Sequence, residues 1–316
     1  MAQLNTLASE AQVTHRPSYA DGVLPDVEED LRIYGCRQIQ QAGQLLRLPQ
    51  VAMGTAQVLF QRFWYISSMA QFSVVDIGMG ALLLGSKLEE APLRLRDLIN
   101  VYDYLDQRAR HEAQPDATDH TPAPHSSFRY QPSEYFSEYF YDRKDAMAVA
   151  EMQILKRLGF DVHVHLPHAL MINYLQVLGL SDVALESGAR GPSHAADAAG
   201  LDTVSAAQAA WNFLNDALQT PVYCLFAPHV IACASIYLLT LTPRAGSRSM
   251  YKPMALPVSP QPWWSLFDVT HAELRACASH MIRLYDTQME ARTATRLRLA
   301  ELCTKRGLRA WLEQHR

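Results

Sequence analysis

Three histidines in the stretch HVHLPH, His163, His165 and His168, are the side chains best suited to holding a metal ion. Neutral imidazole binds zinc or iron, but helical metal pairs usually stand four residues apart and need a further carboxylate or histidine. Here the spacings are two and three, on either side of Pro167. The pattern favours a connecting segment with solvated or capping histidines, so we expect no metal and no other cofactor.

A lysine and two acidic residues close a long apolar run in GSKLEEAP, residues 85–92. Taken alone, Lys87 and Glu90 form an ordinary surface pair on a helix, worth about 0.2–0.5 kcal/mol. The same residues at the end of a buried helix could instead anchor a binding partner. The sequence has no G-x-S-x-G, no Gly-rich phosphate loop and no HExxH, so we do not expect catalysis by this chain.

Composition limits the classes of partner. The 316 residues, 49% hydrophobic and 19% charged, can form two cores of ordinary domain length. A formal net charge of −4 gives no large field to attract nucleic acid or an anionic membrane. Five cysteines without a Cys-x-x-Cys pair indicate a reducing compartment, and no apolar stretch is long enough for a membrane span. We therefore expect an intracellular, soluble protein without strong nucleic-acid binding.

The elements that position Lys87 are predicted to be helices, because apolar residues recur at intervals of three and four. The helix SVVDIGMGALLLGSKLEE begins at Ser73 as N-cap, and it is apolar nearly all round despite Gly78, Gly80 and Gly85. Glycine costs about 1 kcal/mol against alanine in a helix, so close approach of neighbouring helices must offset it. This helix should be the centre of a five-helix bundle, and APHVIACASIYLLTL should be its counterpart in the second half.

The sequence thus predicts an all-α protein of two tandem five-helix bundles with an extra C-terminal helix. The predicted parts are a flexible leader (1–26), a first bundle (27–162) with an exposed insertion (108–132), a second bundle (163–290) and a basic C-terminal helix (291–316). In the last of these, apolar residues indicate that one face of the helix docks on another part of the protein: Leu299, Leu302, Leu308 and Trp311.

The runs ALLLGSKLEEAP and AEMQILKRLGF resemble the cyclin box. More narrowly, seven stretches, in the right order, resemble the cyclin L family over about residues 27–290. They are LLRLPQVAMGTAQVLFQRFWY, EEAPLRLRDLINV, LKRLGFDVHVHLPH, INYLQVLGL, AAWNFLNDALQT, IACASIYL and WWSLFDVT. Gly85 departs from the alanine usual before the Ser-Lys pair, and these 316 residues contain no Arg/Ser-rich tail of the kind that many cyclin L proteins carry.

The resemblance implies a regulatory subunit that contributes no catalytic atom and holds the C-helix of a cyclin-dependent kinase in its active position. It places the polar anchors on Lys87 and Glu151, and the apolar contacts on Leu84, Leu88, Leu155 and Phe160. The implied partner is a PITSLRE-type or related transcriptional kinase, in the nucleus, acting in RNA polymerase II transcription and pre-mRNA splicing. No homo-oligomer is expected.

Two other classes remain open at this point. Transcription factors of the IIB type use cyclin-like repeats to grip DNA, but they need basic repeat faces and usually a zinc ribbon, which a leader without cysteine cannot form. DNA retention at low salt would identify such a protein. A metal-dependent enzyme around the three histidines would be revealed by metal analysis.

Overall fold

The computed structural model describes residues 5–113, 128–134, 137–180, 184–185, 204–241, 254–290 and 299–314. These residues are mostly helical, and the one strand pairing among them joins β1 and β2, of two residues each, in antiparallel register. The elements are α1 (Glu10–Thr14), α2 (Pro17–Ala20), α3 (Pro25–Leu45), α4 (Gln50–Phe63), α5 (Val74–Leu88), α6 (Leu95–Ala113), α7 (Glu138–Arg157), α8 (His168–Val177), β1 (Ala184–Leu185), β2 (Val204–Ser205), α9 (Ala206–Ala217), α10 (Val222–Leu225), α11 (Pro228–Leu238), the 3-10 helix η1 (Trp263–Phe267), α12 (His271–Glu290) and α14 (Lys305–Gln314). The predicted all-α class is confirmed.

The chain divides into two compact units. The first unit comprises residues 8–164 and 287–316, and the second unit comprises residues 1–7 and 165–286. Each unit is built around one buried, apolar helix, as the sequence predicted.

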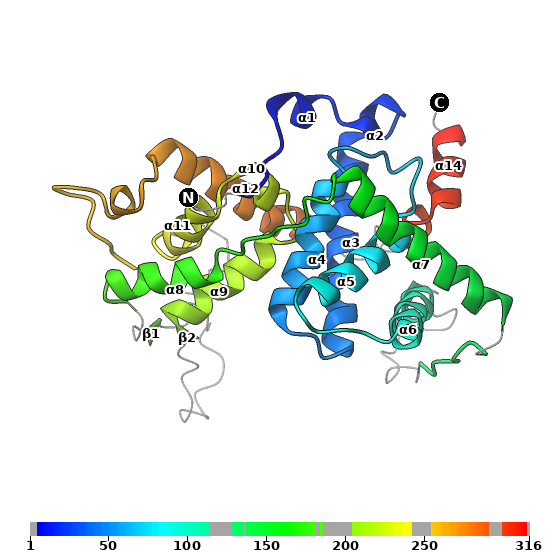
Figure 1. Cartoon of the computed structure of the whole chain (residues 1–316). Helices are drawn as coiled ribbons and strands as arrows, with labels where there is room; N and C mark the ends of the chain where they lie inside the picture. The colour runs from blue at the N-terminus through cyan, green and yellow to red at the C-terminus, as the bar shows by residue number, and fades with distance from the viewer. Residues whose placement is uncertain are drawn as a thin grey trace, which may run out of the picture. The chain divides into compact units, whose positions relative to one another are not determined.

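In the first unit, α5 is the central helix and contacts α3, α4, α6 and α7 (Figure 1). Every residue of α5 from Ile77 to Ser86 is buried, which explains why its sequence shows no polar face. Ser73 caps the helix, since its Oγ accepts a hydrogen bond from Asp76 N at 3.2 Å. The predicted N-cap is therefore confirmed, and it fixes where the helix begins.

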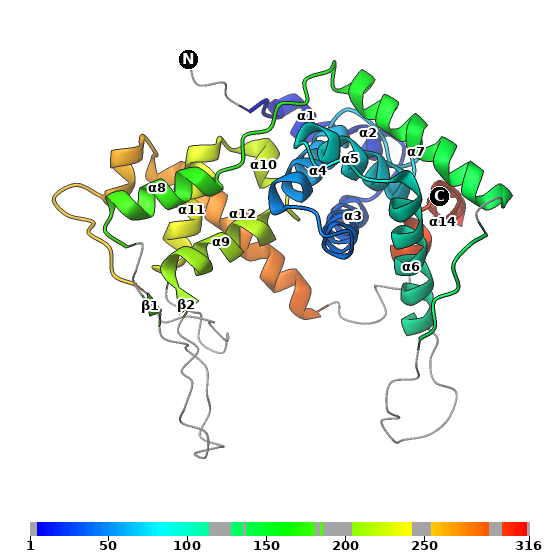
Figure 2. The same cartoon turned by 60° about the horizontal axis from the view of Figure 1, so that its bottom comes forward.

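In the second unit, α11 occupies the corresponding place and contacts α8, α9, α10 and η1 (Figure 2). Small residues such as Ala232 and Ala234 have no exposed surface, so the neighbouring helices can approach closely. A capping box begins α12, because Thr270 Oγ1 accepts a hydrogen bond from Glu273 N at 3.3 Å and Glu273 Oε2 accepts one from Thr270 N at 3.0 Å.

Residues 8–26 differ from the flexible leader that the sequence predicted. They form α1 and α2, of five and four residues, within the first unit. Arg16 Nη1 donates to the fully buried Glu28 carboxylate at 3.2 Å, and the buried Ser18 Oγ accepts from Met69 N at 3.2 Å. The prediction is wrong for these residues because contacts with distant parts of the chain, which composition does not reveal, stabilise the short helices.

The predicted insertion, residues 108–132, is also shorter than expected at both ends. Residues 108–113 continue α6, and residues 128–132 return along it, with Tyr130 OH donating to Asp103 Oδ2 at 3.2 Å. Burial, reinforced by Asp103, raises the pKa of Tyr130 to about 12. Residues 114–127, 186–203 and 242–253 lie outside the described part of the chain.

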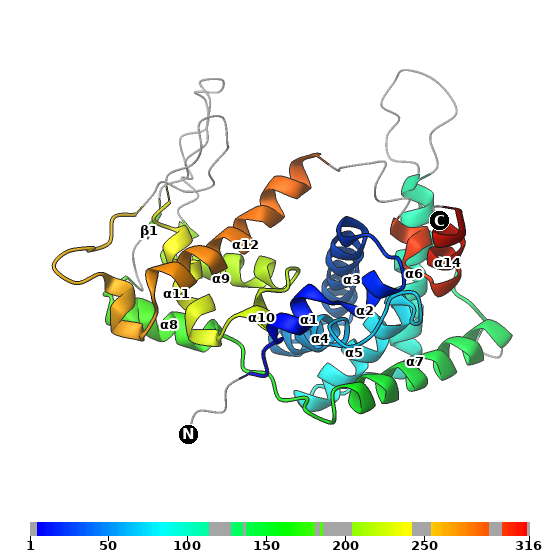
Figure 3. The ribbon, with the colours of Figure 1, turned by 90° about the horizontal axis from the view of Figure 1, so that it is seen from above.

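The cysteines and the C-terminal helix complete the fold. All five cysteines are buried and free of disulfides. The helix α14 and the helical turn over residues 299–302 belong to the first unit (Figure 3), whereas residues 291–298 lie outside the described ranges. Across the described residues, no helix combines the length and apolarity that crossing a membrane requires.

Candidate functional site

The C-terminal end of α5 meets α7 through one ion pair. Lys87 Nζ lies 2.6 Å from Glu151 Oε1, and the two side chains are 52% and 17% exposed. We call this region, with the four apolar residues predicted to surround the pair, the Lys87–Glu151 edge. Its residues are Leu84, Lys87, Leu88, Glu151, Leu155 and Phe160.

Glycines in α5 set the distance between the helices that carry the pair. A Cβ built on Gly80 would lie 2.8 Å from Glu151 N and 2.9 Å from Ala150 Cβ, closer than real Cβ atoms approach. A Cβ on Gly85 would lie 2.9 Å from the carbonyl oxygen of Ala52 in α4. The predicted close approach is therefore confirmed at both positions, and Gly80 brings the Glu151 backbone against α5.

The pair contributes little to the stability of the fold. Exposed ion pairs contribute about 0.2–1 kcal/mol, because water screens the charges and two side chains lose freedom. An ammonium group carries three N–H donors and a carboxylate four acceptor positions, so one contact leaves several available. The arrangement can hold one donor and one acceptor group side by side for the backbone of a partner.

Both helices end in turns that carry backbone strain. At the end of α5, Ala91 N donates to Ser86 O at 2.8 Å and Glu90 N to Lys87 O at 3.4 Å, which is the Schellman pattern. Glycine normally occupies the left-handed position of this motif, but here it is Glu90, with φ of 51°. A side chain costs about 1–2 kcal/mol there.

The end of α7 has the same pattern and a stronger departure. Gly159 stands at the C′ position with φ of 61°, and Phe160 N donates to Leu155 O at 2.9 Å. Phe160 itself has φ of 61°, and it is 67% exposed. A bulky residue with positive φ and an aromatic ring in solvent is costly in two ways, a combination that is typical of binding surfaces.

The four predicted apolar residues differ in exposure. Phe160 and Leu88 are 67% and 38% exposed, so both present apolar surface to solvent. Leu155 is partly buried against the core, and Leu84 is only 5% exposed. Leu84 therefore supports the edge from beneath and offers little surface of its own.

The sequence reasoning missed two features of this region. Met152 and Val149 on α7 are 51% and 58% exposed, which a search for apolar residues off the buried stripe of α7 could have found. Thr55 Oγ1 in α4 donates to Glu89 Oε1 at 2.7 Å, next to the Glu90 turn. That bond joins positions 34 apart in the chain, so no local pattern could have revealed it.

The three histidines do not form one cluster within a unit. His163 belongs to the first unit, where its carbonyl oxygen accepts from Arg62 Nη1 at 2.7 Å. His165 belongs to the second unit, where Asn5 bonds its backbone N and O at 2.7 and 2.9 Å. His168 is buried, with Nε2 3.0 Å from Asn215 Oδ1, and burial lowers its pKa despite that bond. Among the described residues, no group of three His, Cys, Asp or Glu side chains could hold a metal ion.

Comparison with known proteins gives consistent results. The model of the cyclin N-terminal domain matches residues 3–163 of 316, half of the chain. Human cyclin-L1 is 37% identical over 281 residues, which cover 89% of this chain and 44% of that protein. Human cyclin-L2 is 35% identical over 283 residues, covering 89% of this chain and 45% of that protein. The chain therefore spans less than half the length of these curated relatives.

Solved structures share the fold at low sequence identity. A chain from the crystal structure of the yeast RNA Pol II CTD kinase CTDK-1 complex matches with a TM-score of 0.59 and 14% identity, over 91% of this chain and 75% of that one. A chain of the CAK complex from Chaetomium thermophilum, bound to ATP-gamma-S, matches with a TM-score of 0.51 and 15% identity, over 93% and 79%. The family model and the curated relatives establish that this chain belongs to the cyclin family, within its cyclin L group.

Proposed function

We propose that this cyclin is the non-catalytic regulatory subunit of a cyclin-dependent protein kinase and that the Lys87–Glu151 edge binds the regulatory C-helix of the kinase. The observation that carries the proposal is the ion pair itself. It joins the two helices at 2.6 Å, yet Lys87 is half exposed, so the fold gains little from it. A partner that covered the pair would exclude water and strengthen each polar contact made there.

The mechanism follows from what kinases require. Phosphoryl transfer needs a strand lysine paired with a C-helix glutamate, so the C-helix must be rotated inward. A subunit that binds only this inward position shifts the kinase population toward the active state. Moving the ratio of active to inactive kinase from 1:99 to 99:1 takes about 5.5 kcal/mol of differential binding. The polar anchors would fix the C-helix backbone, and Leu88 and Phe160 would supply apolar contact area.

For the partner, we propose a PITSLRE-type or related transcriptional kinase, acting in the nucleus on RNA polymerase II transcription and pre-mRNA splicing. Similarity to cyclin-L1 and cyclin-L2 supports the cyclin L assignment on which this part depends. The likeness to chains of the CTD kinase and CAK complexes supports a role beside a kinase.

A pull-down from nuclear extract tests the proposal. The baits are the wild type, the variant Lys87→Ala/Glu151→Ala, and a control with the exposed α6 ion pair removed, Arg110→Ala/Asp106→Ala. Mass spectrometry should find a cyclin-dependent kinase with the wild type and the control but not with the first variant. Equal retention by all three baits, or no kinase on any of them, would refute the proposed edge. DNA retained at low salt would favour the IIB-type alternative.

A further inference from the structure

The C-terminal segment, which we define as residues 299–314, is part of the core of the first unit. Leu302, Cys303, Leu308 and Trp311 are 1–9% exposed and lie in the same hydrophobic cluster as the central residues of α5. Arg309 Nε adds a hydrogen bond to Ala70 O at 3.0 Å, in the connection that leads into α5. The opposite face of α14, with Lys305 and Arg306, is exposed. The segment is therefore docked by its apolar side beside the start of the central helix.

Cys303 completes the N-terminal cap of α5. Its carbonyl oxygen accepts hydrogen bonds from Val74 N at 2.9 Å and Val75 N at 3.4 Å, and from Ser73 Oγ at 3.4 Å. The first amides of any helix lack partners within the helix, and Val74 is only 1% exposed, so water has little access to it. The Cys303 carbonyl oxygen thus supplies Val74 N and Val75 N with an acceptor that the residues before α5 do not.

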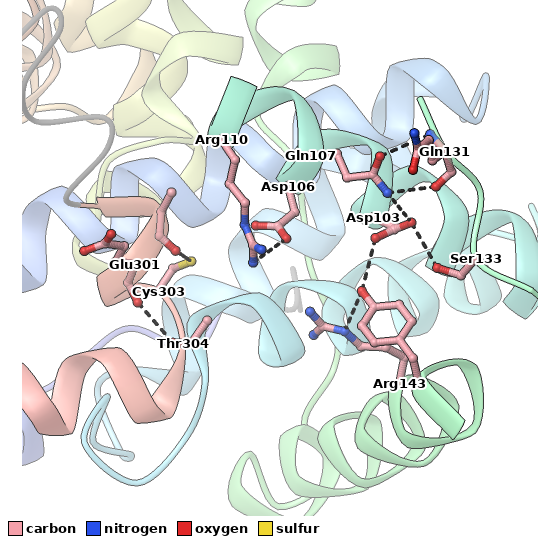
Figure 4. Close-up of polar contacts among 12 residues, drawn as sticks. Asp103, Asp106, Gln107, Arg110, Gln131, Ser133, Arg143, Glu301, Cys303 and Thr304 are labelled. Atoms are coloured by element: carbon pink, nitrogen blue, oxygen red, sulfur yellow. Dashed lines mark hydrogen bonds and ion pairs between the residues drawn. The ribbon is translucent and has the colours of Figure 1, made fainter. Parts of the chain in front are cut away.

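A tight corner aims the Cys303 carbonyl at α5. Thr304 Oγ1 donates to Glu301 O at 3.0 Å (Figure 4). It also accepts from Gly307 N at 3.1 Å, so Thr304 caps α14. A Cβ on Gly307 would overlap the carbonyl oxygen of Glu301. The corner therefore needs glycine at this position, and any side chain there would push α14 away from residues 299–303.

The same end of α5 is tied to α7. Arg143 Nη1 donates to Asp76 Oδ1 at 3.0 Å, joining the first turn of α5 to α7. Arg143 Nε also donates to Tyr139 OH at 3.3 Å, and Tyr139 OH donates to Asp103 Oδ1 of α6 at 3.3 Å (Figure 4). Because α5 and α7 also carry Lys87 and Glu151 at their other ends, whatever fixes this end fixes the pair of helices on which the edge depends.

We infer that the C-terminal segment is a positioning element for the Lys87–Glu151 edge. By capping α5 through Cys303 and filling the core beside it, the segment holds α5 in register with α7, so that Lys87 and Glu151 meet at the far end. The inference rests on the proposed function for its consequence in kinase binding. The effect on α5 itself can be measured without any kinase.

The test compares hydrogen exchange and kinase binding in four proteins. They are the wild type, Leu308→Ala, Gly307→Ala and the control Arg306→Ala, which changes an exposed residue of the same helix. Loss of the cap should speed exchange of the Val74 and Val75 amides at least about tenfold in the first two variants, because opening there no longer breaks the Cys303 bonds. Affinity for a purified PITSLRE kinase domain should fall in the same two variants, and the control should match the wild type in both measurements.

Two results would overturn the inference. Unchanged exchange at Val74 and Val75 in both variants would show that the segment does not cap α5. Faster exchange with unchanged kinase affinity would show that the C-terminal segment affects only the N-terminal end of α5 and does not position the Lys87–Glu151 edge. Lys87→Ala, measured alongside, separates this failure from failure of the proposed function. If Lys87→Ala weakens kinase binding and the α14 variants do not, only the positioning role is lost. If Lys87→Ala also binds normally, the proposed edge is wrong.

Discussion

Lys87 Nζ on α5 and Glu151 Oε1 on α7 stand 2.6 Å apart, although 64 residues separate them in the chain. Gly80 allows the backbones of the two helices to approach closely. The ion pair lies at the solvent-exposed margin of this helix contact. Since an exposed pair stabilises a fold by only about 0.2–1 kcal/mol, its position matters more than its energy.

Gly80→Ala should destabilise the protein and weaken kinase binding. The new Cβ would meet Glu151 N and Ala150 Cβ at 2.8 and 2.9 Å, so α7 must shift. Overpacking of this kind costs about 1–3 kcal/mol. Gly78→Ala is the matched control, because its Cβ would meet Tyr102 OH at 3.3 Å, a contact that a small side-chain movement can relieve. Urea unfolding should show a clearly lower free energy of unfolding for Gly80→Ala. For Gly78→Ala the free energy of unfolding should change by no more than about 1 kcal/mol, because the higher helix propensity of alanine offsets the tight contact. Equal effects would contradict this account of the helix contact.

Phe160→Gly should change stability and binding in different directions. Glycine relieves the strain at φ of 61°, and little burial is lost because Phe160 is 67% exposed. The free energy of unfolding should stay level or rise by about 1 kcal/mol. Kinase affinity should fall by about 2 kcal/mol, the usual loss for an aromatic anchor. A variant that lost stability but kept its affinity would assign Phe160 to the fold.

Glu28→Gln should be among the most destabilising single changes in the first unit. Its carboxylate has no exposed surface and bonds Arg16 and Arg32, whose guanidinium groups also lie 5.0 and 4.7 Å from the centre of the Tyr65 ring. Breaking one member of a buried ion pair costs about 3–5 kcal/mol. Asp26→Asn, an exposed change in the first turn of the same helix, should cost no more than about 1 kcal/mol. Thermal unfolding distinguishes the two variants. Similar unfolding midpoints would show that the ion pairs of Glu28 with Arg16 and Arg32 contribute little to stability.

Stability should depend on pH through His168. Burial lowers its folded pKa below the ordinary value of 6.5, so the folded state favours the neutral ring. The stability that the neutral ring contributes is complete above pH 6.5 and is lost as the pH falls through the folded pKa. His168→Gln keeps a donor for Asn215 Oδ1 and removes the titration. Urea unfolding between about pH 5 and pH 7.5 should show a steeper loss on acidification for the wild type. If the free energy of unfolding fell equally with pH in both proteins, His168 would not contribute to the pH dependence of stability.

Local patterns were enough to predict the elements that depend on neighbours in the chain. Ser73 caps α5, Gly159 ends α7, and Thr270 pairs with Glu273, because each of these bonds spans five residues or fewer. The buried α5 was predictable because an apolar surface all round leaves a helix no stable place except among other helices.

Contacts between residues far apart in the chain determine the features that local patterns did not predict. The helices α1 and α2 have four or five residues, too few to be stable alone, and Arg16 is held by Glu28 in another helix. Leu308 and Trp311 predicted that one face of the C-terminal helix docks, but not that Cys303 would cap a helix 230 residues earlier. The strain at Glu90 and Phe160 was equally hidden, since both positions usually exclude side chains.

Charge reversal of the central pair tests the proposed function most directly. In Lys87→Glu/Glu151→Lys the two side chains can still pair with each other, so the free energy of unfolding should change by less than about 1 kcal/mol. Donor and acceptor would then face the wrong backbone groups of the kinase C-helix. Calorimetry with a purified PITSLRE kinase domain should show binding at least about 100-fold weaker than that of the wild type. Wild-type affinity in the reversed variant would contradict the account, because the pair would then serve only the fold.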